Sequence, residues 1–251
     1  MAYTTIDNPE LFFQVKTYTG TGSAASITLD GSEDMQPDWV WIKNRGNSAR
    51  HMLYDVIRGV QETLFSDLTN AETAGAGHLT AFNSDGFSLG DNSGTGSSNG
   101  SSETYVSWNW KAGGSASSNT NGSITSSVSA SSTSGFSIAT YTGNGTDNAT
   151  FGHGLSSAPE MVWLKQRNST GNWRVGATPM DSSFDEVMNL NLSNAKASAS
   201  TIFSAVAPNS TVVTLGTEGD ANGNTNTFVA YCFHSVQGYS KIGKYTGNGA
   251  S

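Results

Sequence analysis

Several features are scarce in this chain of 251 residues, and each scarcity narrows what the protein can be. Cys232 is the single cysteine, which excludes an intrachain disulfide and a cysteine-rich zinc site. Charged residues make up only 13% of the chain, and the formal net charge of −8 is the wrong sign for a nucleic-acid backbone. No stretch approaches the ~20 consecutive apolar residues of a transmembrane helix. We therefore expect a globular protein without membrane insertion and without a nucleic-acid partner.

The first residues also lack the marks of a secretory signal. Residues 1–7 contain neither a basic start nor an apolar core. The surface nevertheless resembles that of an extracellular protein, because Gly, Ser, Thr and Asn stand where Lys and Glu are usual, and Gly alone fills 29 positions. This combination predicts a protein that is assembled in a cytoplasm and exposed to the outside later.

The chain contains an internal repeat. The ten residues that begin at Phe13 return at Phe136 and, cut short, at Ile242. Later landmarks keep the same spacing, since 93 positions separate Tyr18–Lys111 and 93 again separate Tyr141–His234. Two bodies of equal length with different connectors predict a tandem array of one domain.

The repeat places the domain boundaries. We predict a first β-sandwich repeat over residues 1–114, a linker of Ser, Gly and Asn over 115–121, and a second repeat over 122–238. Residues 239–251 read as the start of a third, truncated repeat. A strand and a turn cannot bury a core alone, so we expect the chain to belong to a longer protein, or its last strand to complete something else.

Alternating hydrophobicity dominates the chain, and helical periodicity is nearly absent. Val106, Trp108 and Trp110 share one face of a predicted strand, which is the period of a half-buried strand. Trp39–Lys43 is apolar on both faces, as expected of a central strand covered on two sides. Many short strands joined by Gly- and Asn-rich turns predict an all-β fold of β-sandwich or jelly-roll type.

The acidic residues do not repeat as a catalytic pair would. Glycoside hydrolysis needs two carboxylates about 5 to 10 Å apart. Asp38 alone has an acidic counterpart at a matching landmark, Glu160, whereas Glu103 falls opposite Asn226. We therefore predict no catalytic residues and no enzymatic activity.

Metal and cofactor binding find equally little support. The four histidines are scattered and do not match between the copies. Asp30–Asp34 clusters oxygen atoms that would suit calcium, but it lacks the full spacing of a calcium loop, and a solvated acidic turn is the favoured interpretation. We predict neither a metal nor a cofactor.

Aromatic side chains are the remaining candidates for ligand contact. Trp41 and Trp163 match between the copies, and matched aromatics on strand faces favour a core position. Trp39 and Trp173 have no matching tryptophan, and Trp173 stands in a variable loop. These two, Trp173 first, are the candidate glycan contacts.

Four runs carry a resemblance to a known family: Gln36–Arg45, His51–Asp55, Phe82–Phe87 and Tyr105–Gly114. They resemble a domain found repeatedly in tail-fibre-like proteins of marine bacteriophages, especially cyanophages. The resemblance implies tandem lectin-like β-sandwiches of the concanavalin or SPRY type along a virion appendage, and it implies no established catalytic residue. In the second copy Trp173–Ala177 replaces the His51 run, so a ligand site shared through that loop is not expected.

With this resemblance, the sequence predicts a structural virion protein of a bacteriophage, a tail fibre or similar appendage that spaces or anchors host-recognition elements. The alternative is a carbohydrate-binding module that contacts host surface glycans, and a third reading is a secreted glycan-degrading enzyme. The expected partners are other virion proteins and further copies of the chain, a trimer by family resemblance, with host surface glycans under the alternative. The expected location is the virion, after synthesis in the host cytoplasm.

Overall fold

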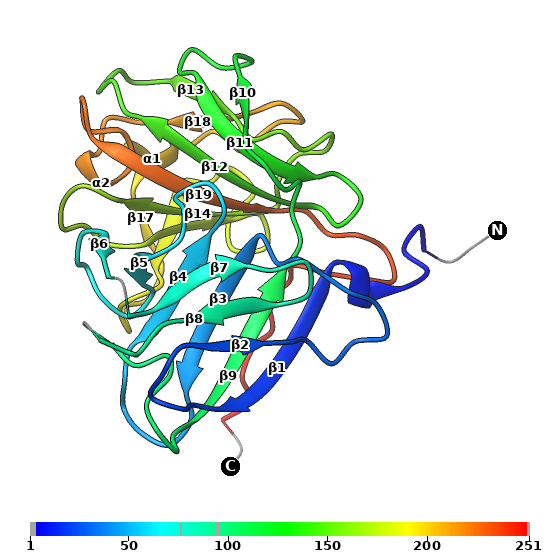
Figure 1. The fold of residues 1–251 in the computed structure, drawn as a ribbon. Coiled ribbons are helices and arrows are strands. Elements are labelled where there is room, and N and C mark those ends of the chain that lie inside the picture. Colours follow the sequence, from blue (N-terminus) through cyan, green and yellow to red (C-terminus); the bar gives the residue numbers. More distant parts are fainter. Residues whose placement is uncertain (1–3, 76, 94–95, 250–251) are drawn as a thin grey trace.

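A computed structural model describes residues 4–75, 77–93 and 96–249 (Figure 1). Strands make up 37% of the chain and helices 5%, so the predicted all-β class is confirmed. The strands form several antiparallel sheets, as a β-sandwich protein requires. Within the described ranges, no helix combines the length and apolar character needed to cross a membrane.

The first half contains one large and one small sheet. The large sheet has the strand order β1-β9-β3-β4-β5-β6, and the small sheet has the order β2-β8-β7. A 3-10 helix, η1 (Pro9–Leu11), precedes β1. The strands are β1 (Phe13–Thr19), β2 (Ala25–Ile27), β3 (Trp39–Asn44), β4 (His51–Asp55), β5 (Glu62–Phe65), β6 (Thr73–Ala74), β7 (Leu79–Phe82), β8 (Phe87–Leu89) and β9 (Thr104–Trp110). Val40 and Ile42 of β3 share a buried core with Phe87 and Leu89 of β8, so the two sheets enclose it.

The second half repeats this plan with two additional strands in its large sheet and one strand fewer in its small sheet. Its large sheet has the order β10-β11-β12-β19-β14-β15-β16-β17, and β13 pairs with β18. The strands are β10 (Ser117–Asn119), β11 (Ser126–Ser131), β12 (Phe136–Thr142), β13 (Ala149–Gly152), β14 (Met161–Gln166), β15 (Arg174–Ala177), β16 (Glu186–Asn189), β17 (Ala197–Ser198), β18 (Val212–Leu215) and β19 (Thr227–Phe233). Two one-turn helices, α1 (Ser200–Phe203) and α2 (Gly219–Asn222), flank β18.

The strand pairing of the two halves corresponds in register. Thr19 lies opposite Thr104 where β1 meets β9, and Thr142 lies opposite Thr227 where β12 meets β19. The halves differ at one edge, because β12 is covered by β11 whereas β1 pairs only with β9 in the described part of the chain. The difference arises from the connector, which supplies the two additional strands of the second sheet.

The predicted linker, residues 115–121, is therefore ordered rather than flexible. Its central residues form β10, which pairs with β11. The chain is already fixed before β10, because the Asp38 carboxylate accepts backbone N–H bonds from Ala112 at 2.8 Å and from Gly114 at 3.0 Å. At the other end of the second half, residues 241–249 form no strand, and the third repeat remains a prediction.

The two large sheets also pack against each other, through the faces that point away from the sandwich cores. Figure 1 shows the first half (blue to cyan, with β9 in green) below the second half. Trp39 lies at the centre of this junction with no exposed surface. Its ring centroid lies 4.4 Å from that of Trp110, 4.6 Å from Tyr231, 5.5 Å from Phe136 and 5.9 Å from Trp163. The outer faces of both sheets thus share one aromatic core.

This junction explains an inverted pattern along β9. Ser107 and Asn109 are fully buried on the sandwich side of the sheet, while Trp108 and Trp110 are only half-buried on the outer side. The Asn109 amide donates to the backbone carbonyl of Gln14 at 3.1 Å, which satisfies part of its polarity inside the core. The predicted central strand with two covered faces is confirmed for β3, whose side chains alternate between the two cores.

We expect Trp39→Ala to destabilise the whole chain by ~3–5 kcal/mol, because it removes a fully buried indole from the junction. Urea denaturation followed by circular dichroism measures the change. Asn194→Ala is the control, since Asn194 is exposed, and we expect it to change stability by less than ~0.5 kcal/mol. Equal effects of the two substitutions would contradict a junction that stabilises both halves.

Candidate functional site

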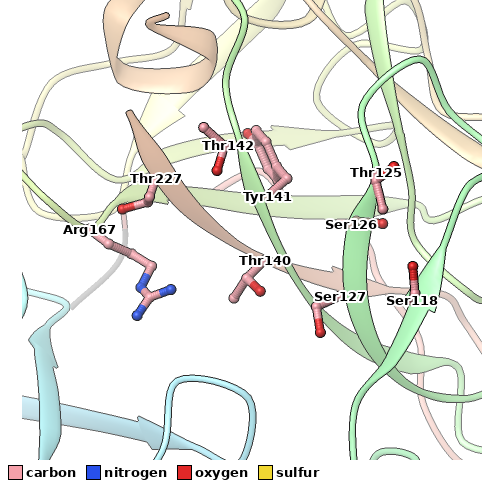
Figure 2. A pocket seen from close by; sticks show the side chains of 9 residues that line it. All are labelled: Ser118, Thr125, Ser126, Ser127, Thr140, Tyr141, Thr142, Arg167 and Thr227. Atoms are coloured by element: carbon pink, nitrogen blue, oxygen red, sulfur yellow. The ribbon is translucent and has the colours of Figure 1, made fainter. Parts of the chain in front are cut away.

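An open groove of about 310 Å³ lies at one end of the second large sheet, beside the first half (Figure 2). Eight of its nine lining residues carry hydroxyl groups, and the ninth is an arginine. The lining consists of Ser118, Thr125, Ser126, Ser127, Thr140, Tyr141, Thr142, Arg167 and Thr227. Strand pairing produces this polar row, because β10, β11 and β12 place Ser118, Ser127 and Thr140 side by side.

Two of these hydroxyls are already committed to the fold. Ser126 donates to the carbonyl of Gly152 at 2.6 Å, and Tyr141 donates to that of Ala221 at 2.7 Å. In the described ranges, the hydroxyls of the other six Ser and Thr residues have no protein partner and can bond to a ligand. The groove therefore suits a neutral ligand with many hydroxyl groups, although no open aromatic ring is available for stacking, since Tyr141 is buried.

Arg167 forms the charged wall of the groove and joins the two halves. Its guanidinium donates to the Glu72 carboxylate from Nη2 at 2.7 Å and from Nε at 3.0 Å, and the Glu72 N–H donates to the Arg167 carbonyl at 2.7 Å. Arg58 donates to the other oxygen of Glu72 at 2.8 Å. The carboxylate thus lies between two guanidinium groups, and the arginine in the groove wall is largely neutralised.

A buried ion pair continues this network into the junction. Arg58 Nε lies 2.5 Å from Asp55 Oδ2, and both side chains have no exposed surface. Tyr231, which comes from the second half, donates its hydroxyl to the same carboxylate oxygen at 2.7 Å. Burial acts to lower the pKa of Arg58, but Asp55, Tyr231 and Glu72 together hold that pKa well above its ordinary value. The guanidinium is therefore permanently charged and satisfied across the junction.

Lys165 is the second buried cation at this boundary. Its Nζ donates to the Gln166 carbonyl at 2.7 Å and to the Thr69 carbonyl of the first half at 3.3 Å. Burial lowers its pKa from 10.5 to about 8, while Asp220 and Glu72 act in the opposite direction. The side chain has no exposed surface, so the shifted pKa reflects a structural contact between the halves and not an accessible nucleophile.

The two predicted glycan contacts lie in the interior, and that prediction is wrong. Trp39 is enclosed by the aromatic junction, and Trp173 is equally without exposed surface. Trp173 stacks 6.2 Å from Tyr231 and donates its indole N–H to the Phe65 carbonyl of the first half at 2.8 Å. The two tryptophans have no matching tryptophan in the other half because the two halves contribute different residues to one shared core.

Trp41 and Trp163 do occupy corresponding positions, on β3 and β14. They meet edge to face across the junction, with ring centroids 5.9 Å apart. Both rings are half-buried rather than fully buried. In the described part of the chain their indole N–H groups have no hydrogen-bond acceptor.

The one repeated acidic position has a structural role. Asp38 holds the chain that leaves β9, as described above, and Glu160 accepts a hydrogen bond from Ser235, two residues after the corresponding end of β19. Glu103 is likewise occupied by the fold, because it accepts bonds from Tyr105 at 2.5 Å and Asn44 at 2.8 Å. These contacts use the carboxylates to fix loops.

The acidic turn at residues 30–34 is also held by protein groups. Lys16 pairs with Asp30, and the Gly31 N–H donates to Gln14 at 2.9 Å. The described ranges contain no cluster of three or more His, Cys, Asp or Glu side chains that could hold a metal ion.

The sequence interpretation missed Asp55, Arg58, Glu72 and Lys165 as a group. Asp55 and Arg58 lie only three residues apart, but Glu72 and Lys165 are distant from them in the sequence and approach them only in the folded chain. The available signal was the rarity of charge itself, since a chain with so few charged residues that buries several of them must pair them.

The chain belongs to a family of proteins described as Domain of unknown function (DUF7483), whose model matches residues 8–251. The match spans both halves together with the C-terminal segment. No match was found among curated proteins or among solved structures.

We expect Arg58→Met to destabilise the protein by ~3–5 kcal/mol, because the carboxylates of Asp55 and Glu72 would remain buried without their shared cation. Arg50→Met is the matched control. Arg50 pairs with Asp67 at 3.3 Å on the surface, where such a pair contributes ~1 kcal/mol or less. Chemical denaturation at pH 7 compares the two variants, and similar losses would contradict the proposed importance of the buried pair.

Lys165 also makes the stability of the protein depend on pH. Its folded pKa of about 8 lies below the ordinary 10.5, so between these values the unfolded state binds more protons than the folded state. The contribution of this group to stability therefore rises with pH through that window. We expect the free energy of unfolding of the wild type to increase relative to Lys165→Met between pH 8 and pH 10. Lys196→Met, at an exposed position, gives the baseline and is expected to show no such trend.

Proposed function

We propose that this chain is a structural component of a bacteriophage virion, a tail fibre or similar appendage, in which it spaces or anchors host-recognition elements. We also propose that its halves are tandem jelly-roll or concanavalin-like domains with the boundaries given above. The observation that carries the proposal is that the repeated residues serve the fold: paired tyrosines in the cores, the acids Asp38 and Glu160 at the connectors, and glycines in the turns.

The junction supports a mechanical role. An aromatic core around Trp39 and the ion pair between Glu72 and Arg167 join the halves through an apolar and a charged contact. Together with the ordered connector, these contacts hold the halves in one relative orientation. A spacer in a fibre needs this property, because a hinge between its domains would fail to hold a distal receptor-binding element in place.

The proposed partners are other virion proteins and further copies of the chain, arranged as a trimer, and the proposed location is the virion. We propose no catalytic activity. This fits a molecule in which the carboxylates of Asp38, Asp55, Glu72, Glu103 and Glu160 are each bonded to protein groups.

The experiment is a virion preparation from the phage that encodes the chain. We expect mass spectrometry to detect the polypeptide in purified particles, and an antibody against it to label the appendages in electron micrographs. A polypeptide that is absent from particles and releases reducing sugar from a polysaccharide in solution would refute the proposal.

A second candidate function, binding of host surface glycans, rests on the hydroxyl-lined groove. We expect Thr140→Val combined with Thr142→Val to weaken glycan binding about tenfold, because each lost hydrogen bond contributes ~0.5–1.5 kcal/mol. Thr17 and Thr19 take the corresponding places on β1, where β10 and β11 have no counterpart, so Thr17→Val with Thr19→Val is the matched control. A glycan array probed with the wild type and both variants measures this binding. Equal binding by all three proteins would exclude the groove as the glycan site.

A further inference from the structure

The C-terminal segment Ile242–Gly249 has the sequence of a strand but is not in a sheet. It shares the Tyr-Thr-Gly-x-Gly run that begins at Tyr18, near the end of β1, and at Tyr141, near the end of β12. In Figure 1 it is the red end of the chain, beyond β19. The preceding Tyr239 packs edge-on against Phe12 at 6.2 Å, and from residue 243 onward the segment is exposed.

The shared tyrosine occupies an equivalent packing position in both halves. Tyr18 stacks on Tyr105 of β9 at 5.1 Å, and Tyr141 stacks on the corresponding Phe228 of β19 at 5.2 Å. Each hydroxyl donates to a backbone carbonyl at 2.7 Å. Tyr245 is 94% exposed in contrast, so an aromatic residue suited to a sandwich core lies in solvent.

The shared glycines lead to the same conclusion. A Cβ atom on Gly20 would lie 2.3 Å from the Gly100 oxygen, and one on Gly143 would lie 2.5 Å from the Gly223 oxygen, so both positions require glycine. Around Gly247 there is nothing within 4 Å, and its own surroundings do not require a glycine. The last glycine of the run has the same left-handed φ in all three places, +70° at Gly22, +68° at Gly145 and +69° at Gly249.

We propose that Ile242–Gly249 is the first strand of a sandwich sheet supplied by a second copy of this chain, where it takes the place of β1. The acceptor is β9 of the second copy. β1 is the exchangeable strand, because among the described strands it pairs with β9 alone, whereas β12 is held between β11 and β19. This interaction goes beyond the proposed function and holds wherever the protein is used.

The exchange fills the position of Tyr18 in the acceptor and changes two neighbouring positions. Tyr245 enters the seat of Tyr18, and Ile242 replaces Val15, which is 47% exposed on the outer face. Gly243 replaces Lys16, whose inward-pointing ammonium group pairs with Asp30. An inward-pointing charge on an edge strand hinders pairing with a further strand. A strand that carries glycine at this position lacks that protection. Because donor and acceptor surfaces differ, successive exchanges join copies head to tail.

Disulfide trapping in the full-length protein tests the register. Thr17 lies opposite Val106, so residue 244 of the donor should lie opposite residue 106 of the acceptor. We expect Lys244→Cys combined with Val106→Cys to form disulfide-linked dimers and longer chains on mild oxidation, visible on a non-reducing gel. Lys244→Cys with Ser107→Cys is the control, since Ser107 points to the opposite face and should give at least tenfold less product. Cys232 is buried and does not interfere.

Sedimentation velocity gives an independent measurement. We expect the wild type to associate as its concentration rises and Tyr245→Ser to associate at least tenfold more weakly, while circular dichroism of the two remains identical because Tyr245 contacts neither half. The proposal is overturned if the 244/106 variant stays monomeric on oxidation, if the control crosslinks equally, or if Tyr245→Ser leaves association unchanged.

Discussion

The packing of two sheet faces around Trp39 is the contact on which the arrangement of the whole molecule depends. Each half has its own core between a large and a small sheet, and the third core lies between the halves. Because the outer faces of both large sheets are aromatic, leaving them in water would expose an extensive apolar surface. Packing them together removes that surface and fixes the halves in one orientation.

The pairing of the buried charged residues follows from this packing. Once the sheets pack, Asp55 and Arg58 are removed from contact with water. The cost of this desolvation is offset by the ion pair between them and by the further contacts with Tyr231 and Glu72. Each partner that comes from the other half couples the ionic contact to the aromatic one. The hydroxyl-lined groove begins where this packing ends, on the part of the second sheet that the first half leaves uncovered.

Much of the local structure could be predicted from the residues. The period of two in β3 and β9 identified strands, and the repeated Tyr-Thr-Gly run identified corresponding turns. Both signals arise from interactions between neighbours along the chain, or from backbone angles that only certain residues accept. The candidate site could not be predicted in this way. Trp39 and Trp173 were predicted to contact a ligand, because the second sheet that buries them leaves no signal in the neighbouring sequence.

The sequence by itself determined the all-β class, the alternation of each strand and the matching landmarks of the two halves. Only the tertiary structure decided which face of each sheet is inside. Along β9 the polar face with Ser107 and Asn109 enters the sandwich, and the tryptophan face packs on the other half. The physical reason is that alternation distinguishes two faces without stating what covers either one. That depends on residues more than a hundred positions away, such as Tyr231, which the folded chain brings together.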